Sequence, residues 1–486
     1  MSPLHLIDVT LRDAHQSLWA TRMTNAMMAP WLASIDEVGF HTVDLVGGAV
    51  FDVCVRYLRE NPWCRMRMAA RRVRRTPLNV WIRGQSLFTF QLFPDDVVAA
   101  TVKHIAACGV RHLTTYDALN DMRNVQSSVA AAKSAGLGVT GALVYTLSPV
   151  HMDEYYQARS RELLALKVDR LCIKDPSGLL TPKRIRTLVP AVKRVAGKVP
   201  LELHSHCLSG LAPQVYAEAM DLGVHYLHTA VSPLANGASL PAAEYVIEQA
   251  RMRKRTLSVN SAALRDMAGY FAWIAHREGK PVGRPARYDP SLYEHQVPGG
   301  MISNLQTQLR AAGLGDQLEK VLREVARVRE DLGYPIMVSP FAQFLITQAT
   351  LNVVQGERYK TVPDEIRKYA LGHYGRAAAP MAPEFLERAI GSRNQVAGRP
   401  ADHLAPAIPR LIEERGPFAD NDHLLLAAYY DDALVRPVLT TDDEVARSLR
   451  FVTSPLLELE QYLTRSADIQ HARLRFGSTQ LSVGSR

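Results

Sequence analysis

Eight short apolar segments rich in β-branched residues run through the first half of the chain and constrain its fold more than any other feature. Helix-like stretches such as "FPDDVVAATVKHIAACG" separate them, and several of these end in glycine, as helix C-termini often do. Eight strands that alternate with helices over about 230 residues predict a (β/α)8 barrel. The segments begin near residues 4, 41, 78, 112, 138, 170, 201 and 226.

A doubly wound open sheet is the competing architecture. It rarely has eight such evenly spaced units, and no G-x-G-x-x-G sequence follows the first predicted strand. After about residue 250 the pattern changes, and stretches such as "PFAQFLITQATLNVVQG" predict helices with few strands between them. We therefore expect an α/β barrel over residues 1–255, a mostly helical region over 256–440 and a tail of unknown role over 441–486.

Composition narrows the class of protein. A hydrophobic content of 47% and a charged content of 22% are ordinary for a globular protein in water. No run reaches the roughly 18 apolar residues of a membrane span, and the N-terminus lacks the pattern of a signal peptide. Five scattered cysteines do not form a disulfide framework. These features predict a cytoplasmic protein.

The net charge of +9 is partly local, since "CRMRMAARRVRR" carries six arginines between Arg65 and Arg75. Nucleic-acid binding is one interpretation of such a cluster. No recognition motif or interleaved aromatic residues accompany it, so a solvated helix face or a contact for an acidic partner is favoured. We expect no nucleic-acid partner.

Polar side chains gather where the predicted strands end, which is where barrels of this class carry their chemistry. "LELHSHCLSG" places His204 and His206 two residues apart, hence on one face of a strand. The first strand runs into Asp13, the third ends at Arg83 and the sixth at Lys174. A carboxylate and two imidazoles suit a divalent transition metal such as zinc, manganese or cobalt. Ordinary hydrogen bonds at the barrel rim are the alternative.

Sequence motifs along most of the chain add to this interpretation. They occur in order between about residues 4 and 440: "DVTLRDAHQSLWATRM", "GGAVFD", "IRGQS", "YDALNDMRN", "TLSPVHMDEYY", "CIKDPSGLLTP", "LHSHCLSGLA", "HQVPGGMISNL", "VREDLGYPIMVSP", "GERYKTV", "YGR" and "GRPAD". The chain thereby resembles the biotin-dependent carboxyltransferases that act on pyruvate. This family includes the carboxyltransferase domain of pyruvate carboxylase, the α subunit of oxaloacetate decarboxylase and the central subunit of transcarboxylase. No biotin-attachment sequence of the A-M-K-M type is present. The resemblance is therefore to a free-standing subunit whose biotin sits on another polypeptide.

The resemblance implies a complete metal shell. The family ligands are an Asp, two His and a carbamylated Lys, which fall on Asp13, His204, His206 and Lys174. Carbon dioxide added to Lys174 would turn a repelling ammonium into an anionic oxygen ligand. An unmodified lysine, or one paired with Asp175, is the alternative.

The resemblance also assigns the substrate site. Arg83 and Gln16 match residues that hold the 2-oxo acid, and a guanidinium fork suits a carboxylate or an enolate oxygen. Arg12 and Asp52 match positions that bind the substrate or support the site. A structural ion pair at the rim is the alternative for both.

Ser339 matches the family threonine of "V-T-P", which carries a proton between the methyl group of pyruvate and a biotin nitrogen; here the stretch reads "VSP". Ser339 keeps the hydroxyl, so the resemblance implies the same catalytic role. Serine followed by proline is also a helix-start signal, which predicts Ser339 as an N-cap and Pro340 as the first helical residue. Both roles are compatible.

Several positions depart from the family pattern. Thr114 replaces an arginine near the substrate, Phe90 a tyrosine and Val46 a tryptophan, and a small polar loop reads "NGASLP" over 236–241. Losing an arginine removes a cation that could meet a carboxylate, and losing a phenol removes a hydrogen bond. The departures predict either a substrate other than pyruvate or a different pose.

The leading hypothesis is a metal-dependent carboxyltransferase subunit that works between carboxybiotin on a separate carrier protein and a pyruvate-like 2-oxo acid, or decarboxylates the corresponding oxaloacetate-like acid. A biotin carboxylase subunit and a homo-oligomer are further expected partners. A biotin-independent lyase or aldolase acting on a 2-oxo acid is the alternative, because a stabilised enolate also serves carbon–carbon cleavage. A degenerate subunit kept as a scaffold is the third hypothesis, which the complete metal constellation opposes.

Overall fold

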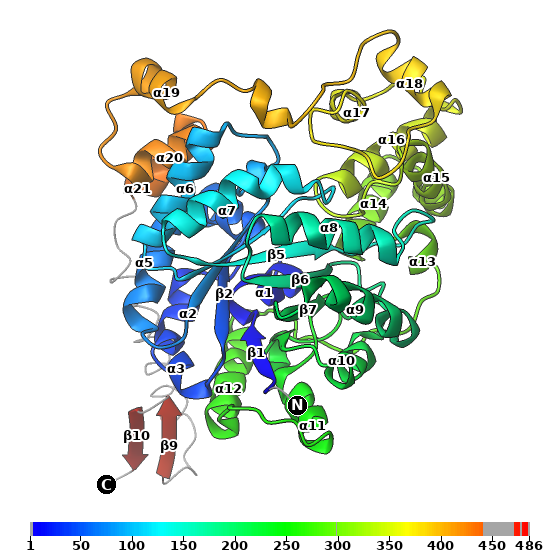
Figure 1. Ribbon diagram of the computed structural model, residues 1–486. Helices are drawn as coiled ribbons and strands as arrows, with labels where there is room; N and C mark the ends of the chain where they lie inside the picture. The colour runs from blue at the N-terminus through cyan, green and yellow to red at the C-terminus, as the bar shows by residue number, and fades with distance from the viewer. Residues whose placement is uncertain (1–2, 298, 441–470, 477–478, 485–486) are drawn as a thin grey trace.

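The computed structural model describes residues 3–297, 299–440, 471–476 and 479–484. Eight parallel strands close into a barrel in sequence order (Figure 1). The (β/α)8 prediction is confirmed, and so is the helical region that follows it. The barrel strands are β1 (His5–Asp8), β2 (Thr42–Val46), β3 (Leu78–Ile82), β4 (His112–Tyr116), β5 (Gly138–Val144), β6 (Arg170–Asp175), β7 (Leu201–Ser205) and β8 (Tyr226–Thr229).

The barrel strands present alternate side chains to the surrounding helices and to the barrel interior. In β7, Leu201 and Leu203 belong to the main hydrophobic core, whereas the side chains of Glu202 and His204 make polar contacts inside the barrel. Buried parallel strands usually read as continuous apolar runs. In β7, by contrast, apolar and polar residues alternate, and the polar ones give the barrel a polar interior below its C-terminal end.

Helices surround the barrel and begin at ordinary start signals. The side chain of Asn61 accepts a hydrogen bond from the backbone N–H of Trp63 at the start of α5, and Thr181 caps α9 in the same way through Arg184. The helices of the barrel region are α1 (His15–Leu18), α2 (Asn25–Leu32), α3 (Ile35–Val38), α4 (Gly48–Val53), α5 (Pro62–Arg72), α6 (Asp95–Ala107), α7 (Gln126–Ser134), α8 (Asp153–Ala165), α9 (Pro182–Ala196), α10 (Ala212–Asp221) and α11 (Ala243–Met252).

The arginine cluster of α5 is partly structural. Arg65 is fully buried and donates to Glu60 and Asn25 at 2.8 and 2.7 Å. Arg67 forms a two-bond ion pair with Asp422, far along the chain. The solvated face expected for the whole cluster is thus wrong for Arg65, because its guanidinium cross-links the barrel's first helices.

The helical region packs against the mouth of the barrel. A second hydrophobic core joins Trp81 and Tyr116 of the barrel to Phe341, Leu345 and Ile366. The helices after the barrel are α12 (Ser261–Arg277), α13 (Leu292–His295), α14 (Gly299–Ala311), α15 (Leu318–Asp331), α16 (Phe341–Gln355), α17 (Asp364–Ala370), α18 (Pro383–Ile390), α19 (Ile408–Arg415), α20 (Asn421–Tyr429) and α21 (Asp432–Thr440). Of these, α12 packs instead on α2 and α3 in the main core.

The last helices return to the beginning of the barrel. In Figure 1, α20 and α21 lie beside α6, and contacts between α20 and α6 bear this out. Within the expected tail, β9 (His471–Phe476) and β10 (Thr479–Gly484) pair antiparallel, while residues 441–470 lie outside the described residues. Across the described ranges, no helix combines the length and apolar character that a bilayer span requires.

Candidate active site and metal centre

A cavity of about 690 Å³ opens at the C-terminal ends of the barrel strands. Both the barrel and the helical region contribute to its wall, through residues as far apart as Asp13 and Tyr429. All but one of the predicted site residues line it: Arg12, Asp13, Gln16, Asp52, Arg83, Lys174, His206 and Ser339. The exception, His204, is fully buried and lies against the cavity floor, with its Nε2 3.3 Å from Nε2 of His206.

Three of the predicted metal ligands converge at this floor. Oδ2 of Asp13 lies 3.0 Å from Nε2 of His204 and 3.6 Å from Nε2 of His206. Ligand atoms about 2.0–2.1 Å from a tetrahedral ion stand roughly 3.3 Å apart, so the three atoms are spaced as a shared zinc-type ion requires. The donor set therefore fits a divalent transition metal.

The local chain path explains this convergence. After β1 the chain makes a short turn of π-helix, η1 (Thr10–Ala14), which begins where the carboxylate of Asp8 accepts hydrogen bonds from the backbone N–H and the hydroxyl of Thr10. That turn carries Asp13 toward β7, where His204 is the last-but-one residue of the strand. The chain continues for two residues beyond His204, which brings His206 to the same side.

The protonation states suit metal binding. Burial opposes ionisation of Asp13, but the Arg12 guanidinium holds the pKa of that carboxyl well below its usual range. Burial and the charge of Lys174 lower the pKa of His204 well below its usual value. Nδ1 of His206 lies 2.7 Å from the carbonyl oxygen of Ala238 and donates to it, which leaves Nε2 with a free lone pair. A carboxylate and neutral imidazoles are the forms that ligate.

Lys174 lies next to His204 in the barrel, since the two residues are paired in the β6–β7 register. Its ammonium stands 5.5 Å from the ring centre of Trp81 and 5.6 Å from that of Tyr116. Asp175 accepts hydrogen bonds elsewhere, from the hydroxyl of Ser205 and two backbone N–H groups. Lys174 is therefore held by aromatic faces at the cavity edge.

Arg83 is fixed by backbone groups and by a ring. Its Nη1 donates to the carbonyl oxygens of Phe88 and Thr89, both at 3.1 Å, and its guanidinium lies 4.7 Å from the ring centre of Phe90. Its buried Nε has no partner among the described protein atoms. Gln16, in α1, lines the same cavity. The arrangement leaves a cation in the cavity wall with unused hydrogen-bonding capacity.

Arg12 and Asp52 line the cavity and also form ion pairs. Nη1 of Arg12 lies 2.5 Å from Oδ2 of Asp13, and its guanidinium stands over Trp81. Asp52 accepts a hydrogen bond from Arg56 at 2.8 Å and one from the hydroxyl of Tyr430 at 3.2 Å. Arg12 thus orients a candidate metal ligand, and Asp52 links α4 to the returning end of the chain.

Ser339 is in the cavity wall but does not cap a helix. The N-cap of α16 is Pro340, the helix begins at Phe341, and no side chain accepts a capping hydrogen bond there. The predicted cap is wrong because a serine–proline pair signals a helix start without fixing which of the two residues is the cap. The hydroxyl oxygen of Ser339 instead accepts from the Gln343 amide at 2.9 Å.

The departures from the family pattern lie in different places. Phe90 lines the cavity, and so does Ala238 of the "NGASLP" loop. Thr114 is buried in the barrel interior, where its hydroxyl is hydrogen-bonded to Asn79, and it is not among the residues that line the cavity. Val46 belongs to the hydrophobic core. Of these departures, only Phe90 and the loop can therefore touch a substrate directly.

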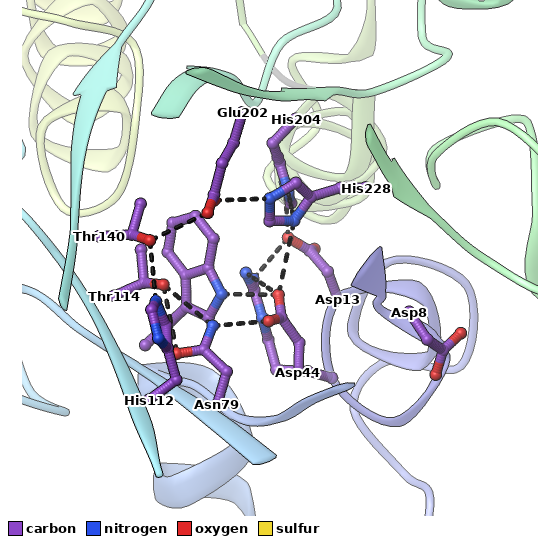
Figure 2. Close-up of polar contacts among 12 residues, drawn as sticks. Asp8, Asp13, Asp44, Asn79, His112, Thr114, Thr140, Glu202, His204 and His228 are labelled. Carbon is purple, nitrogen blue, oxygen red and sulfur yellow. Dashed lines mark hydrogen bonds and ion pairs between the residues drawn. The ribbon is translucent and has the colours of Figure 1, made fainter. Parts of the chain in front are cut away.

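A polar network that was not predicted from the sequence lies beneath the candidate metal ligands. Figure 2 shows it as a chain of contacts across the barrel interior. It joins residues of β2, β3, β4, β5, β7 and β8: Asp44, Asn79, Trp81, His112, Thr114, Thr140, Glu202, His204 and His228. Strand segments such as "LELHS" and "LNVWI" could have indicated this network, because polar side chains interrupt their apolar pattern.

Comparisons with known proteins agree with this geometry. Residues 292–440 match the family model described as a conserved carboxylase domain. A pyruvate carboxylase subunit of Methanocaldococcus jannaschii is 39% identical over 438 residues, which cover 89% of this chain and 77% of that protein. The methylmalonyl-CoA carboxyltransferase 5S subunit of Propionibacterium freudenreichii subsp. shermanii is 35% identical over 404 residues, covering 82% and 80%.

A solved structure has the same fold. The carboxyl transferase domain of Rhizobium etli pyruvate carboxylase, determined with oxamate and biotin, superposes with a TM-score of 0.84 at 24% identity. The match covers 91% of this chain and 78% of that one. The barrel and the helical region after it thus recur together in both proteins.

Proposed function

Because the chain belongs to the carboxyltransferase family that includes the archaeal pyruvate carboxylase subunit and the transcarboxylase 5S subunit, we propose that it transfers a carboxyl group between carboxybiotin and a pyruvate-like 2-oxo acid. Biotin is presented by a separate carrier protein, which a biotin carboxylase subunit charges. The observation that carries the proposal is the meeting of Asp13, His204 and His206 with Arg83 in one cavity.

Asp13, His204 and His206 would hold a divalent cation, and Lys174 would supply the fourth ligand. The neutral amine of Lys174 forms a bond to the carbon of carbon dioxide and loses one proton to solvent, which leaves an anionic carbamate. The carbamate and the carboxylate of Asp13 together carry two negative charges, which balance the charge of a divalent ion. When bound, the cation stabilises negative charge that develops on a substrate oxygen.

Arg83 binds the acid. Its fixed guanidinium presents the charge and the planar donors that a carboxylate or an enolate oxygen prefers. Gln16 adds an amide donor from the neighbouring wall. Phe90, stacked on the guanidinium and half exposed, forms an apolar rim over it. This rim shields the charge of Arg83 from water, which strengthens the attraction.

Ser339 carries a proton between the methyl carbon of the acid and the biotin nitrogen. The amide of Gln343 donates to the Ser339 oxygen, so one lone pair is occupied and the hydroxyl proton stays free to point into the cavity. Removing a proton from the methyl group generates the enolate. The enolate carbon then forms a bond to carbon dioxide released from carboxybiotin, and the leaving biotin nitrogen takes the proton.

The test is oxaloacetate decarboxylation by the purified chain, with and without a biotinylated carrier domain. We expect pyruvate to form only when biotin is present, and the rate to vanish in the Asp13→Asn variant. Elemental analysis should find roughly one equivalent of transition metal in the wild type, and a chain with both His204→Ala and His206→Ala should lose it. Equal turnover without biotin would instead establish a lyase.

A further inference from the structure

The side chain of His228, in the middle of β8, connects a metal ligand to a buried carboxylate. Its Nδ1 lies 3.3 Å from Nδ1 of His204, and its Nε2 lies 3.1 Å from Oε2 of Glu202. Figure 2 shows the three side chains together inside the barrel. All three are at most 1% exposed, so no water competes for these contacts.

The direction of each hydrogen bond follows from the cation. Nε2 of His204 faces Asp13 and His206, so this nitrogen must offer its lone pair to the ion. The neutral ring then carries its only hydrogen on Nδ1, and that hydrogen needs an acceptor. Nδ1 of His228 is in place to accept it, and Nε2–H of His228 then donates to Glu202.

Glu202 is itself held from two other strands. Its Oε1 accepts from the hydroxyl of Thr140 at 3.0 Å and from Arg170 at 3.2 Å. The carboxylate is thereby fixed in place as an acceptor. A metal-ligating histidine whose other nitrogen leads to a carboxylate is a recurrent way of orienting the ring. In this protein a second imidazole, that of His228, lies between the ligating histidine and the carboxylate.

We propose that His228 is a positioning residue that, anchored by Glu202, holds His204 in the tautomer and orientation that present Nε2 to the cation. This inference rests on the metal centre of the proposed function. Oδ2 of Asp44 stands 3.8 Å from the same Nδ1 of His228, beyond hydrogen-bond distance, so Nδ1 of His204 is its nearer partner.

A second ion is the rival explanation for this cluster. Cys172, Glu202 and His228 each offer a ligand atom, and these atoms lie within 4.8 Å of one another. An ion there would take the Nε2 lone pair of His228 and replace its hydrogen bond to Glu202. The hydrogen-bonded arrangement predicts one ion per chain, and the rival predicts two.

The experiment measures metal affinity of the apoprotein by competition with a chromogenic chelator, for Zn²⁺ and Mn²⁺. His228→Leu should weaken binding by about 10- to 100-fold, the loss usual when the partner of a ligating histidine is removed. His228→Asn should recover most of that affinity, because its amide oxygen can accept where Nδ1 does. His112→Leu makes the same change further along the network, beyond Thr140, and should keep wild-type affinity.

The outcomes separate the two ideas. If the wild type binds no transition metal, the metal centre of the proposed function fails and the inference fails with it. If the wild type binds one ion and His228→Leu binds it as tightly, only the inference is overturned. Equal losses in His228→Leu and His112→Leu also overturn it, since they indicate general damage to the interior. Two ions per chain, one of them lost in Cys172→Ser, would replace it with a second site.

Discussion

Gly48 lies so close to the guanidinium of Arg83 that a methyl group on its α-carbon would stand 2.2 Å from Nη1. Gly48→Ala should therefore displace the guanidinium of Arg83 from its present position, because the end of a side chain moves more easily than the backbone. We expect kcat/KM for the 2-oxo acid to fall by about 10- to 100-fold, the order of loss that a small misplacement causes. Steady-state kinetics check this.

The matched control for that variant is Gly269→Ala in α12, where an added methyl group meets nothing within 4 Å. This change should leave kinetics alone and stabilise the helix by roughly 0.5–1 kcal/mol. Unchanged kinetics in Gly48→Ala would mean that Arg83 does not bind the substrate in the conformation described here.

Lys174 should respond to bicarbonate if its amine forms a carbamate. Lys174→Ala should lose carboxyl transfer and most of its metal affinity, because an anionic ligand disappears, and a short acid such as formate should restore part of both. Activity assays with increasing bicarbonate and formate measure this. A Lys174→Arg variant with normal turnover would contradict the carbamate, since arginine stays cationic.

Ser339→Ala should slow carboxyl transfer by roughly 10²- to 10⁴-fold, the usual contribution of a positioned proton carrier. Because Ser339 does not cap α16, the melting temperature and metal content should hardly change. Ser339→Thr should stay active, since it keeps the hydroxyl. Full activity of Ser339→Asn, which keeps an oxygen but no hydroxyl, would show that the proton moves elsewhere.

Asp422 should make the attachment of α20 sensitive to acid. Its carboxylate accepts from Arg67, His104 and Asn61. Burial opposes its ionisation, but these partners hold the pKa of Asp422 well below its usual value. A depressed pKa contributes stability that is complete above about pH 4, the unfolded value, and is lost as the pH falls below it.

Asp422→Asn should thus destabilise the protein at pH 7 by roughly 1.5–3 kcal/mol, the value of hydrogen bonds to a charged group. The difference from the wild type should shrink as calorimetric scans move from about pH 5 to pH 3. Asp432→Asn removes an exposed ion pair with Arg415 and should change little. A wild-type advantage that is the same at every pH would exclude the role of Asp422.

The fold was readable from the sequence because buried parallel strands leave a strong local pattern. The segments predicted to begin near residues 4, 41 and 78 are β1, β2 and β3, which begin at His5, Thr42 and Leu78. The meeting of Asp13, His204 and His206 could be predicted for the same reason. Once the strands close into a barrel, the residues at their C-terminal ends must meet.

Other features depend on contacts between distant parts of the chain and could not be predicted. The burial of Arg65 requires Glu60 and Asn25 to meet around it, and the cluster of arginines gives no local sign of this. The resemblance assigns Thr114 to the substrate site, yet its hydrogen-bond partner is Asn79 on the adjacent strand β3. His228 had no motif, and its place beside His204 depends on how β7 and β8 pair.

The cavity is built from residues that leave the ribosome at very different times. Asp13 is among the first to emerge, whereas Tyr429 of α20 lines the same cavity and Tyr430 donates to Asp52. A growing chain can therefore close its barrel and bring Asp13, His204 and His206 together before the helices that complete the cavity wall have been synthesised. With the metal centre proposed above, an ion would bind before the substrate cavity is complete, and a chain that stalls before α20 would bind metal in an open site that cannot turn over substrate.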